Sequence, residues 1–239
     1  MTSYKERKYC IVNSDDFGAS QGINRGIVEA HTCGILTSAS LMINMPASME
    51  AIRLADEHPT LSVGLHVNFT NEGSPVIDLE DPESAKSELA RQYRLFVERV
   101  GKAPSHIDTH HNIHRQPQLR PLFVEFADMH GILLREHSPV RYYSGFYGQW
   151  DGESHPEHVS PSQLVTVLET EIRPGFTELA CHPGYAADYD STYSREREVE
   201  LRSLCDQIVR QRIQELQIEL INFFDAGKLL RISERTGSA

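Results

Sequence analysis

The stretch Tyr9-Cys-Ile-Val-Asn-Ser-Asp-Asp-Phe-Gly18 joins a short apolar run to a pair of adjacent carboxylates. Its apolar start, residues 9–13, predicts a strand covered on both faces, as in a parallel sheet packed between helices. In parallel α/β folds the catalytic groups gather at the carboxyl ends of the strands. The stretch therefore predicts a buried parallel strand with Asp15 and Asp16 at its functional end.

Strand and helix patterns alternate along almost the whole chain. Short strands are predicted at residues 9–13, 38–44, 61–68, 105–109, 132–135, 178–181 and 218–222. Apolar residues at helical spacing predict helices at 82–100, 119–129 and 194–212, and weaker ones near 21–33, 47–57, 161–172 and 225–231. Seven β/α units in succession predict a parallel sheet with right-handed crossovers.

The predicted fold class is α/β, as a single-domain irregular (β/α) barrel with about seven parallel strands. A doubly wound open sheet is the alternative, because periodicity does not separate the two. We expect one domain over residues 1–232, an inserted loop near 136–160 and a loose tail at 233–239. The spacing of Gly18, Gly22 and Gly26 predicts close packing of a helix.

Composition narrows the class of protein. The hydrophobic share of 39% and the charged share of 24% fit a globular enzyme whose 239 residues can bury a full core. The formal net charge is −11 and no basic run would follow a phosphate backbone, so nucleic acid is not an expected partner. No apolar stretch resembles a membrane span or a signal peptide, and we expect a cytoplasmic protein.

The four cysteines show no CxxC spacing. Cys10 and Cys181 fall inside predicted strands, which predicts buried free thiols and suits a reducing compartment.

Polar groups follow most of the other predicted strands. Residues 38–44 end at Asn44, and residues 61–68 carry His66. Residues 105–109 run into the segment His106-Ile-Asp-Thr-His-His-Asn-Ile-His114, and residues 178–181 lead into His182. Six of the twelve histidines occupy these positions, and imidazole and carboxylate are the ligands that zinc and similar divalent ions prefer. The convergence predicts a metal site.

Two adjacent carboxylates at a strand end cannot point the same way. One of Asp15 and Asp16 can bind metal while the other holds a water or takes its proton. The alternative is a helix-capping aspartate with a solvated neighbour. His66 is best placed to pair with His110 in a site of two histidines and one carboxylate, although a lone strand histidine is more often a hydrogen-bonded core residue.

The neighbouring residues have several possible roles. Asp108 could orient a ligand histidine through its ring N–H or form a structural salt bridge. His111 and His114 could support the ligands or contact substrate, whereas His106 is expected to lie too deep for either role. His182 precedes Pro-Gly and suits a general acid with a pKa near neutrality, but a plain turn residue is an equal alternative. Aromatic residues of the 136–160 segment could stack on a bound ligand or dock on the barrel. These residues are Tyr142, Tyr143, Phe146, Tyr147 and Trp150.

Four motifs, in order along the chain, resemble the YdjC-like carbohydrate deacetylases, which include the chitooligosaccharide deacetylases. The resemblance runs from residue 11 to about 200 and includes the segment Ser194-Arg-Glu-Arg-Glu-Val-Glu200. The motifs are Asn13-Ser-Asp-Asp-Phe-Gly18, Gly64-Leu-His66, the 106–114 segment and Cys181-His-Pro-Gly-Tyr185.

The resemblance implies an irregular β/α barrel that removes an acetyl group from an N-acetylated sugar with one divalent metal ion. Asp16, His66 and His110 would bind the metal, Asp15 would act as base and His182 as acid, and the two aspartates could exchange roles. Further residues implied at the substrate or behind the ligands are Asp108, His111, His114, Asn44 and Tyr185.

The partners and the exact activity stay open at this point. The ion would be Mg²⁺ or Zn²⁺, with Mn²⁺ and Co²⁺ as alternatives. The expected partner is a small carbohydrate, and a homo-oligomer is compatible with the sequence. The alternative functions are a metal-dependent phosphoesterase or other amidohydrolase on the same barrel, and a sugar-binding protein without catalysis.

Overall fold

The computed structural model describes residues 6–185, 187–189 and 191–236, with the backbone alone at 232–236. Its centre is an eight-stranded sheet in the order β5-β4-β3-β2-β1-β9-β6, in which every neighbouring pair is parallel and β10 also pairs with β1. The strands are β1 (Lys8–Phe17), β2 (Ser38–Leu41), β3 (Ser62–Val67), β4 (His106–Thr109), β5 (Leu133–Leu134), β6 (Arg141–Tyr143), β9 (Gly175–Cys181) and β10 (Ile218–Leu220).

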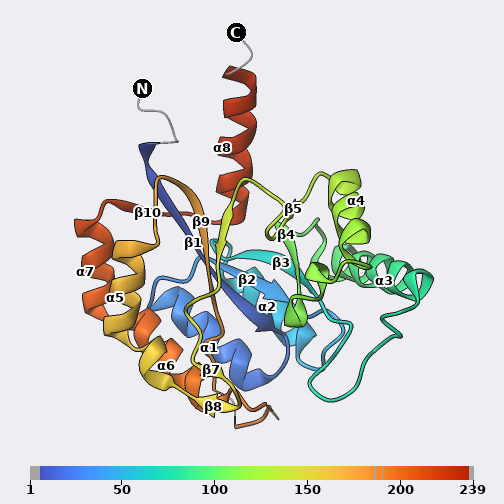
Figure 1. Cartoon of the computed structure of the whole chain (residues 1–239), viewed down its shortest axis with the longest axis horizontal. Helices are drawn as coiled ribbons and strands as arrows, with labels where there is room; N and C mark the ends of the chain where they lie inside the picture. The colour runs from blue at the N-terminus through green and yellow to red at the C-terminus, as the bar shows by residue number, and fades with distance from the viewer. Residues whose placement is uncertain (1–5, 186, 190, 237–239) are drawn as a thin grey trace.

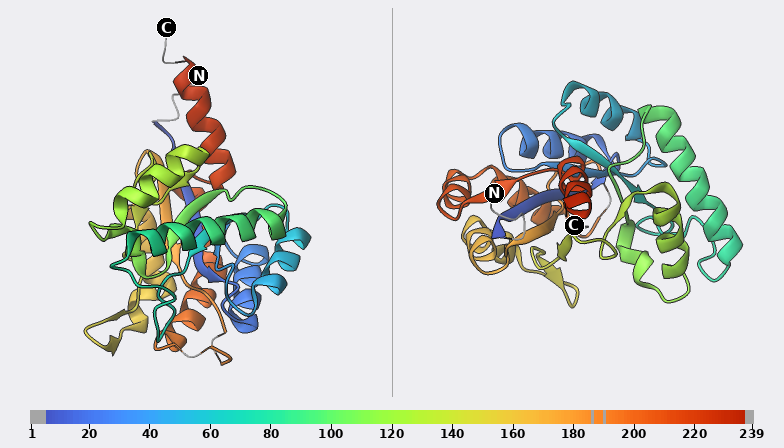
Figure 2. Two further views of the ribbon diagram at one scale, coloured as in Figure 1. Left: turned by 90° about the vertical axis from the view of Figure 1, so that its right-hand side faces the viewer. Right: turned by 90° about the horizontal axis from the view of Figure 1, so that it is seen from above.

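The sheet curls into an irregular, incomplete barrel, which confirms the predicted α/β barrel. Its edge strands β5 and β6 do not pair with each other within the described part of the chain. Helices surround the curled sheet (Figure 2). They are α1 (Gln21–Thr32), α2 (Ser48–Glu57), α3 (Pro82–Val100), α4 (Arg120–His130), α5 (Pro161–Thr170), α6 (Ser194–Cys205), α7 (Gln207–Glu215) and α8 (Phe223–Thr236).

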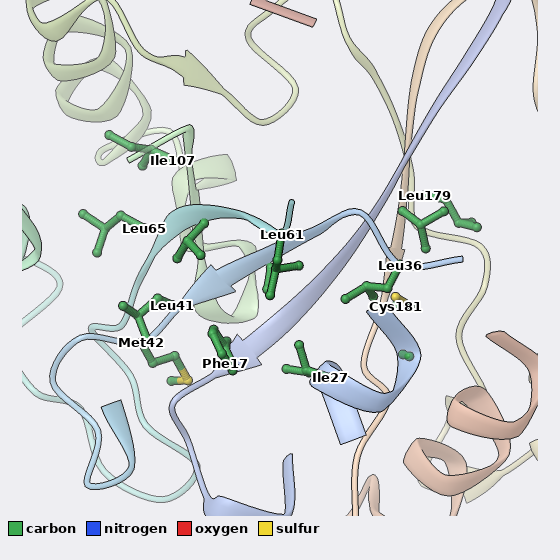
Figure 3. Close-up of a cluster of buried hydrophobic side chains, with 14 of the residues drawn as sticks. Phe17, Ile27, Leu36, Leu41, Met42, Leu61, Leu65, Ile107, Leu179 and Cys181 are labelled. Atoms are coloured by element: carbon green, nitrogen blue, oxygen red, sulfur yellow. The ribbon is translucent and has the colours of Figure 1, made fainter. Parts of the chain in front are cut away.

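Strand β1 is the axis of the fold because it pairs with three strands. Its start pairs with β10, its later half pairs with β2 on the same side, and β9 runs along its other side. The strand is buried from Tyr9 to Phe17. Apolar side chains of β1, β2, β3 and β9, among them Phe17, Leu41, Leu65 and Leu179, pack with Ile27 of α1 in the core (Figure 3).

The two ends of the barrel carry different elements. In Figure 1 the start of β1 and helix α8 lie at one end of the molecule, and β1 runs from there toward the end that carries β7 (Gln149–Trp150) and β8 (Glu153–Ser154). The carboxyl ends of the parallel strands therefore face the β7–β8 end.

The prediction of a single helix over 194–212 is wrong, because this segment forms the two helices α6 and α7. Asp206 separates α6 from α7 with an extended backbone (φ −69°, ψ 136°), and its side chain accepts a hydrogen bond from the N–H of Ile208. An aspartate that caps a new helix in this way ends the preceding one. Apolar spacing alone does not reveal the break because Leu201, Leu204 and Ile208 keep helical spacing across it, although Ile208 is 56% exposed in the structure.

The segment 136–160 is more structured than the predicted loop. It contributes β6, which pairs with β9 at the edge of the sheet, and the antiparallel β7–β8 pair, followed by a short 3-10 helix at Pro156–Val159. At the other end of the chain, α8 continues to Thr236, so it overlaps the expected tail, and residues 237–239 lie outside the described part.

Close helix packing at the glycines is confirmed. A Cβ at Gly22 would overlap the carbonyl oxygen of Tyr185, and one at Gly26 would lie 2.5 Å from the Cα of Gly184. Helix α1 therefore touches the segment that follows His182, and only glycine allows this approach.

Two smaller predictions can be compared directly. Cys10 and Cys181 are buried free thiols, as predicted. Among the described helices, none combines the length and the apolar character that crossing a membrane requires.

Candidate active site and metal centre

A cavity of about 460 Å³ opens at the carboxyl ends of the strands. Six of the predicted site residues line it, from four different places in the fold. These are Asp15 and Asp16 of β1, His66 of β3, His110 and His111 after β4, and His182 after β9. The remaining lining residues are Glu72, Asn112, Arg115, Tyr142, Ser144, Phe146, Tyr147, Gln149, Ala180, Ser191, Thr192, Tyr193 and Arg197.

The end of β1 turns its two aspartates apart. The pairing of β1 with β2 shifts register between Ser14 and Phe17, and Asp16 has a left-handed backbone with φ 68°. A non-glycine residue held in this region costs free energy, and such residues cluster at functional sites. The predicted separation of the two carboxylates therefore has a local backbone cause.

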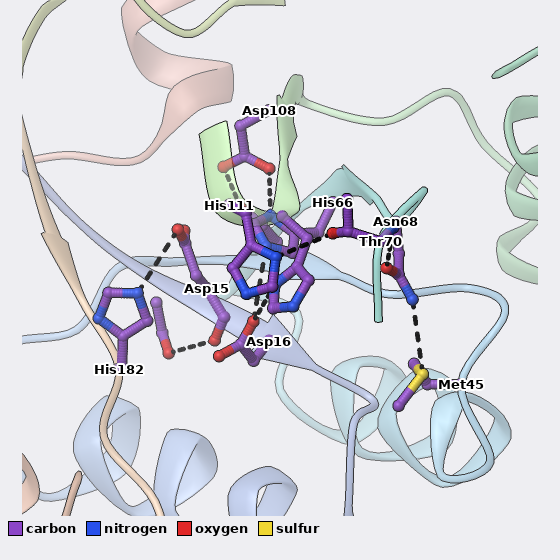
Figure 4. Close-up of polar contacts among 12 residues, drawn as sticks. Asp15, Asp16, Met45, His66, Asn68, Thr70, Asp108, His111 and His182 are labelled. Atoms are coloured by element: carbon purple, nitrogen blue, oxygen red, sulfur yellow. Dashed lines mark hydrogen bonds and ion pairs between the residues drawn. The ribbon is translucent and has the colours of Figure 1, made fainter. Parts of the chain in front are cut away.

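Asp16 faces two imidazoles with one oxygen and an arginine with the other. Its Oδ1 lies 3.5 Å from His66 Nε2 (Figure 4) and 3.3 Å from His110 Nδ1, while Arg197 donates to Oδ2 at 2.6 Å. Burial opposes ionisation of Asp16, but Arg197 and the histidines outweigh it and hold the pKa of this carboxyl well below its usual range. Asp16 is an anion at neutral pH.

His66 is held from behind by Asp108. The distance from His66 Nδ1 to Asp108 Oδ1 is 2.7 Å, which turns Nε2 toward Asp16. Burial alone would lower the pKa of His66, but Asp108 and Asp15 raise it to about 10. Asp108 is itself fixed by Ser40 and Arg135, both 2.7 Å from its Oδ2. A carboxylate behind a histidine is the usual support of a metal ligand.

His110 begins the 3-10 helix His110–Arg115 that follows β4. Its ring packs edge-on against His66, with centroids 5.6 Å apart, and lies over the ring of His111 at 3.8 Å. His111 has a left-handed backbone with φ 55°, and its Nδ1 is 2.9 Å from Thr70 Oγ1. His111 thus braces His110 at the edge of the cavity.

The cluster of Asp16, His66 and His110 fits a divalent cation. Asp16 Oδ1 is buried without a hydrogen-bond partner, which is costly unless an ion or water contacts it. Oxygen and nitrogen ligands held tetrahedrally at about 2.1 Å from zinc lie about 3.4 Å apart. The measured 3.3 and 3.5 Å around Asp16 Oδ1 agree with this spacing.

Two other groups of ligand atoms fit less well. Asp15, His66 and Asp108 form one, but Asp15 and Asp108 already bind the guanidinium of Arg135. Glu72, His110 and His111 form the other. There Glu72 accepts a hydrogen bond from Tyr189, and His111 is paired with Thr70. A cation at either place would have to displace existing partners.

Asp15 has a different environment from Asp16. Arg135 donates to both of its oxygens, at 2.7 and 2.9 Å, and Asn13 Nδ2 is 3.3 Å from Oδ1. Arg135 is buried, follows β5 and also donates to Glu178 at 2.6 Å. The guanidinium therefore joins Asp15 of β1 to Glu178 of β9 inside the barrel and fixes the orientation of the Asp15 carboxylate.

His182 lies on the far side of Asp15 from the metal cluster. Its Nε2 is 3.8 Å from Asp15 Oδ2, and its backbone N–H donates to Glu200 Oε2 at 2.5 Å. Its Nδ1 is buried without a hydrogen-bond partner, 4.0 Å from Glu200 Oε1. Burial lowers the pKa of His182 to about 4, and the nearby aspartates only partly oppose it. The side chain is 22% exposed, and its pKa is shifted below the neutral range expected for a general acid.

Four predicted residues do not line the cavity. Asp108 lies behind His66. His114 is buried between Thr109 Oγ1 at 2.7 Å and Glu136 Oε2 at 3.0 Å. Asn44 donates to the carbonyl of Asn68, and Tyr185 donates to Glu29. These contacts hold the loops around the site.

Sequence reasoning missed three charged residues here, Arg135, Arg197 and Glu200. Arg135 ends the predicted strand 132–135, so the rule applied to the aspartates and histidines would have found it. Arg197 and Glu200 lie in the segment 194–200 that carries the resemblance, but they sit mid-helix, where charged residues usually face solvent. Here α6 buries both.

Known proteins share this sequence and fold. The family model of YdjC-like proteins matches residues 9–215. A carbohydrate deacetylase from Geobacillus stearothermophilus is 34% identical over 93% of this chain and 99% of its own length. A chitooligosaccharide deacetylase from Salmonella paratyphi B is 31% identical over 90% of this chain and 98% of its own length.

Solved structures agree on the fold. A proposed cellobiose-phosphate cleavage protein from Enterococcus faecalis V583 superposes with a TM-score of 0.81 at 25% identity, over 92% of this chain and 98% of that one. A family 4 acetyl xylan esterase from Clostridium thermocellum, at 10% identity and a TM-score of 0.57, covers 93% of this chain and 91% of that one and shares the fold alone. The family match and the near full-length relatives confirm the resemblance carried by the four motifs, and this chain belongs to the YdjC-like protein family.

Proposed function

We propose that this protein is a metal-dependent hydrolase that removes the acetyl group of an N-acetylated sugar and releases acetate. The observation that carries the proposal is the buried cluster of Asp16, His66 and His110, which lines the cavity beside Asp15 and His182 and leaves Asp16 Oδ1 without a hydrogen-bond partner. Relatives named carbohydrate deacetylase and chitooligosaccharide deacetylase support the choice of an acetylated sugar as substrate.

Asp16, His66 and His110 would hold the ion, with Asp108 orienting His66. A bound divalent ion polarises an amide carbonyl and makes water a better nucleophile at neutral pH. One carboxylate and two imidazoles suit Zn²⁺ and also accept Mg²⁺, Mn²⁺ or Co²⁺.

Asp15 is the base in this proposal. Both of its oxygens are fixed by Arg135, and its carboxylate reaches the cavity next to the cluster. It takes a proton from the attacking water as the water oxygen bonds to the carbonyl carbon. General base catalysis by a positioned carboxylate contributes about 10²–10⁴-fold to a rate.

His182 passes the proton to the leaving group. The ring starts neutral because burial lowers its pKa to about 4, so it must gain a proton during the reaction before it can act as an acid. Its Nε2 is 3.8 Å from Asp15 Oδ2, close enough for a relay after a small movement. The C–N bond then breaks, the sugar nitrogen receives the proton, and acetate leaves.

Acetate release from metal-depleted and reloaded protein tests the proposal. The protein is stripped with a chelator and reloaded with Zn²⁺, Mg²⁺, Mn²⁺ or Co²⁺. N-acetylglucosamine and its β-1,4-linked disaccharide are the substrates, with glucose and cellobiose as controls that lack the amide. We expect acetate only from the acetylated sugars and only with metal. A fully loaded protein that releases none would contradict the proposal, and two ions per chain would favour a phosphoesterase.

A further inference from the structure

Three aromatic side chains of the 136–160 segment line the cavity, and Tyr147 is the one that packs against His182. Tyr147 lines the cavity and is 39% exposed, and its ring centroid is 5.8 Å from that of His182. Phe146 is only 1% exposed, and the ring of Tyr142 lies against the guanidinium of Arg135. Trp150 is 41% exposed but stacks on His155 at 3.8 Å and does not line the cavity.

Tyr147 is held in place by a second tyrosine. The rings of Tyr147 and Tyr193 stack with centroids 4.5 Å apart and an angle of 4° between their planes. Tyr193 is only 5% exposed, and its hydroxyl both donates to Glu200 Oε1 at 2.6 Å and accepts from the N–H of Gly148 at 2.9 Å. Tyr193 therefore fixes the ring of Tyr147 and the backbone next to it.

The same carboxylate holds the aromatic pair and the histidine. Glu200 accepts from the Tyr193 hydroxyl with one oxygen and from the His182 N–H with the other. Two further hydrogen bonds, both 3.2 Å, join Gln149 to Thr192 and tie the inserted segment to the chain before α6. The position of Tyr147 relative to His182 is thus set by tertiary contacts, which is what a pre-organised binding surface requires.

We propose that Tyr147, stacked on Tyr193, is the binding platform for the sugar ring whose nitrogen leaves, a role that rests on the proposed function. The C–H groups on one face of a pyranose form an apolar surface that packs on an aromatic ring. The scissile nitrogen is bonded directly to that ring. A sugar on Tyr147 would therefore carry its nitrogen toward His182, while the acetyl carbonyl points to the cluster of Asp16, His66 and His110.

The platform can be tested with four variants. Tyr147→Ala removes the ring, and Tyr147→Phe keeps it while removing the hydroxyl. Tyr193→Phe keeps both rings but removes the hydrogen bonds to Glu200 and Gly148. Trp150→Ala is the matched control, since it removes an exposed aromatic ring of the same segment that lies outside the cavity.

Two readouts separate binding from turnover. Isothermal titration measures Kd for N-acetylglucosamine and its β-1,4-linked disaccharide on metal-loaded protein that also carries Asp15→Asn, and acetate release measures kcat and KM without that change. We expect Tyr147→Ala to raise Kd and KM about three- to tenfold, in line with aromatic stacking, with a smaller change in kcat. Tyr193→Phe should have a smaller effect, and Tyr147→Phe should recover most of the affinity that Tyr147→Ala loses because it keeps the ring. Trp150→Ala should stay within about twofold of wild type.

The outcomes distinguish this inference from the proposed function. Wild-type affinity in Tyr147→Ala, an equal loss in Trp150→Ala, or no saturable binding of either sugar to the unsubstituted platform would overturn it. A weaker Kd in Tyr147→Ala without acetate release by the wild type would support the platform and contradict deacetylation. Thermal midpoints of all variants show whether a loss of binding reflects unfolding.

Discussion

Asp15 and Asp16 are neighbours in the sequence, yet each belongs to a different half of the site. Asp15 has both oxygens bound by Arg135 and faces His182. Asp16 gives one oxygen to Arg197 and leaves the other open toward His66 and His110. The Asp16 half has open ligand atoms that suit a cation, and the Asp15 half has a fixed, partnered carboxylate that suits proton transfer.

The difference teaches that tertiary partners, and not residue type, separate the two roles. Each aspartate has one arginine, but Arg135 comes from the end of β5 and Arg197 from α6. The left-handed backbone of Asp16 turns its side chain away from that of Asp15 and toward β3 and β4. Two adjacent aspartates thereby contact different charged and polar groups.

The largest expected effect comes from Asp16→Asn, which removes the carboxylate of the Asp16 half. We expect the variant to lose its bound ion on dialysis and acetate release to fall to background, because an amide oxygen is a weaker ligand than a carboxylate. Metal analysis by mass spectrometry and an acetate assay measure both. Full metal content in this variant would contradict the role of Asp16 as a metal ligand.

Asp15→Asn should lower acetate release by about 10²–10⁴-fold, the usual contribution of general acid–base catalysis. Its metal content should stay equal to that of wild type, since the Asp16 half is intact. The same two measurements apply. If this variant loses the ion and Asp16→Asn keeps it, the two aspartates have the opposite roles.

Asp108→Asn sharpens the comparison by weakening the support of His66. We expect metal affinity to fall about 10- to 100-fold, the usual effect of removing a partner behind a metal ligand. Titration against a competing chelator measures the affinity. Activity restored by excess metal would agree with a supporting role, whereas activity that stays low at saturation would place Asp108 in the reaction itself.

The smallest expected effect is a pH dependence of the free energy of unfolding. It comes from Glu200, which accepts a hydrogen bond from the backbone N–H of His182 in the Asp15 half. Burial raises the pKa of Glu200 to about 8, although hydrogen bonds from His182 and Tyr193 oppose it. The folded protein therefore retains a proton that the unfolded chain has lost between about pH 5 and 8. Stability falls as pH rises through this range.

Glu200→Gln removes that penalty because the amide does not ionise. The free energy of unfolding of the variant relative to wild type should rise by about 1 kcal/mol or more between pH 5 and 8. Urea unfolding of both proteins in the same chelator-containing buffer measures the difference. A difference that is constant with pH would contradict a raised pKa for Glu200.

The strands were predictable because their apolar runs are short and bounded by polar residues. All seven predicted strands are present, and β6 was missed because Arg141–Tyr143 is a half-exposed edge strand without an apolar run. The break at Asp206 was missed for a related reason, since apolar spacing continues across it.

The sequence by itself determined that polar residues follow the parallel strands, which brings Asp15, Asp16, His66, His110 and His182 to one end of the barrel. Only the tertiary structure decided what surrounds each of them. Hydrogen bonds and ion pairs across 120 or more residues join Arg135 to Asp15 and Arg197 to Asp16. Burial sets the pKa of His182, and packing places Tyr147, not Trp150, at the cavity. Partners and burial depend on which distant segments meet, and no local pattern encodes that.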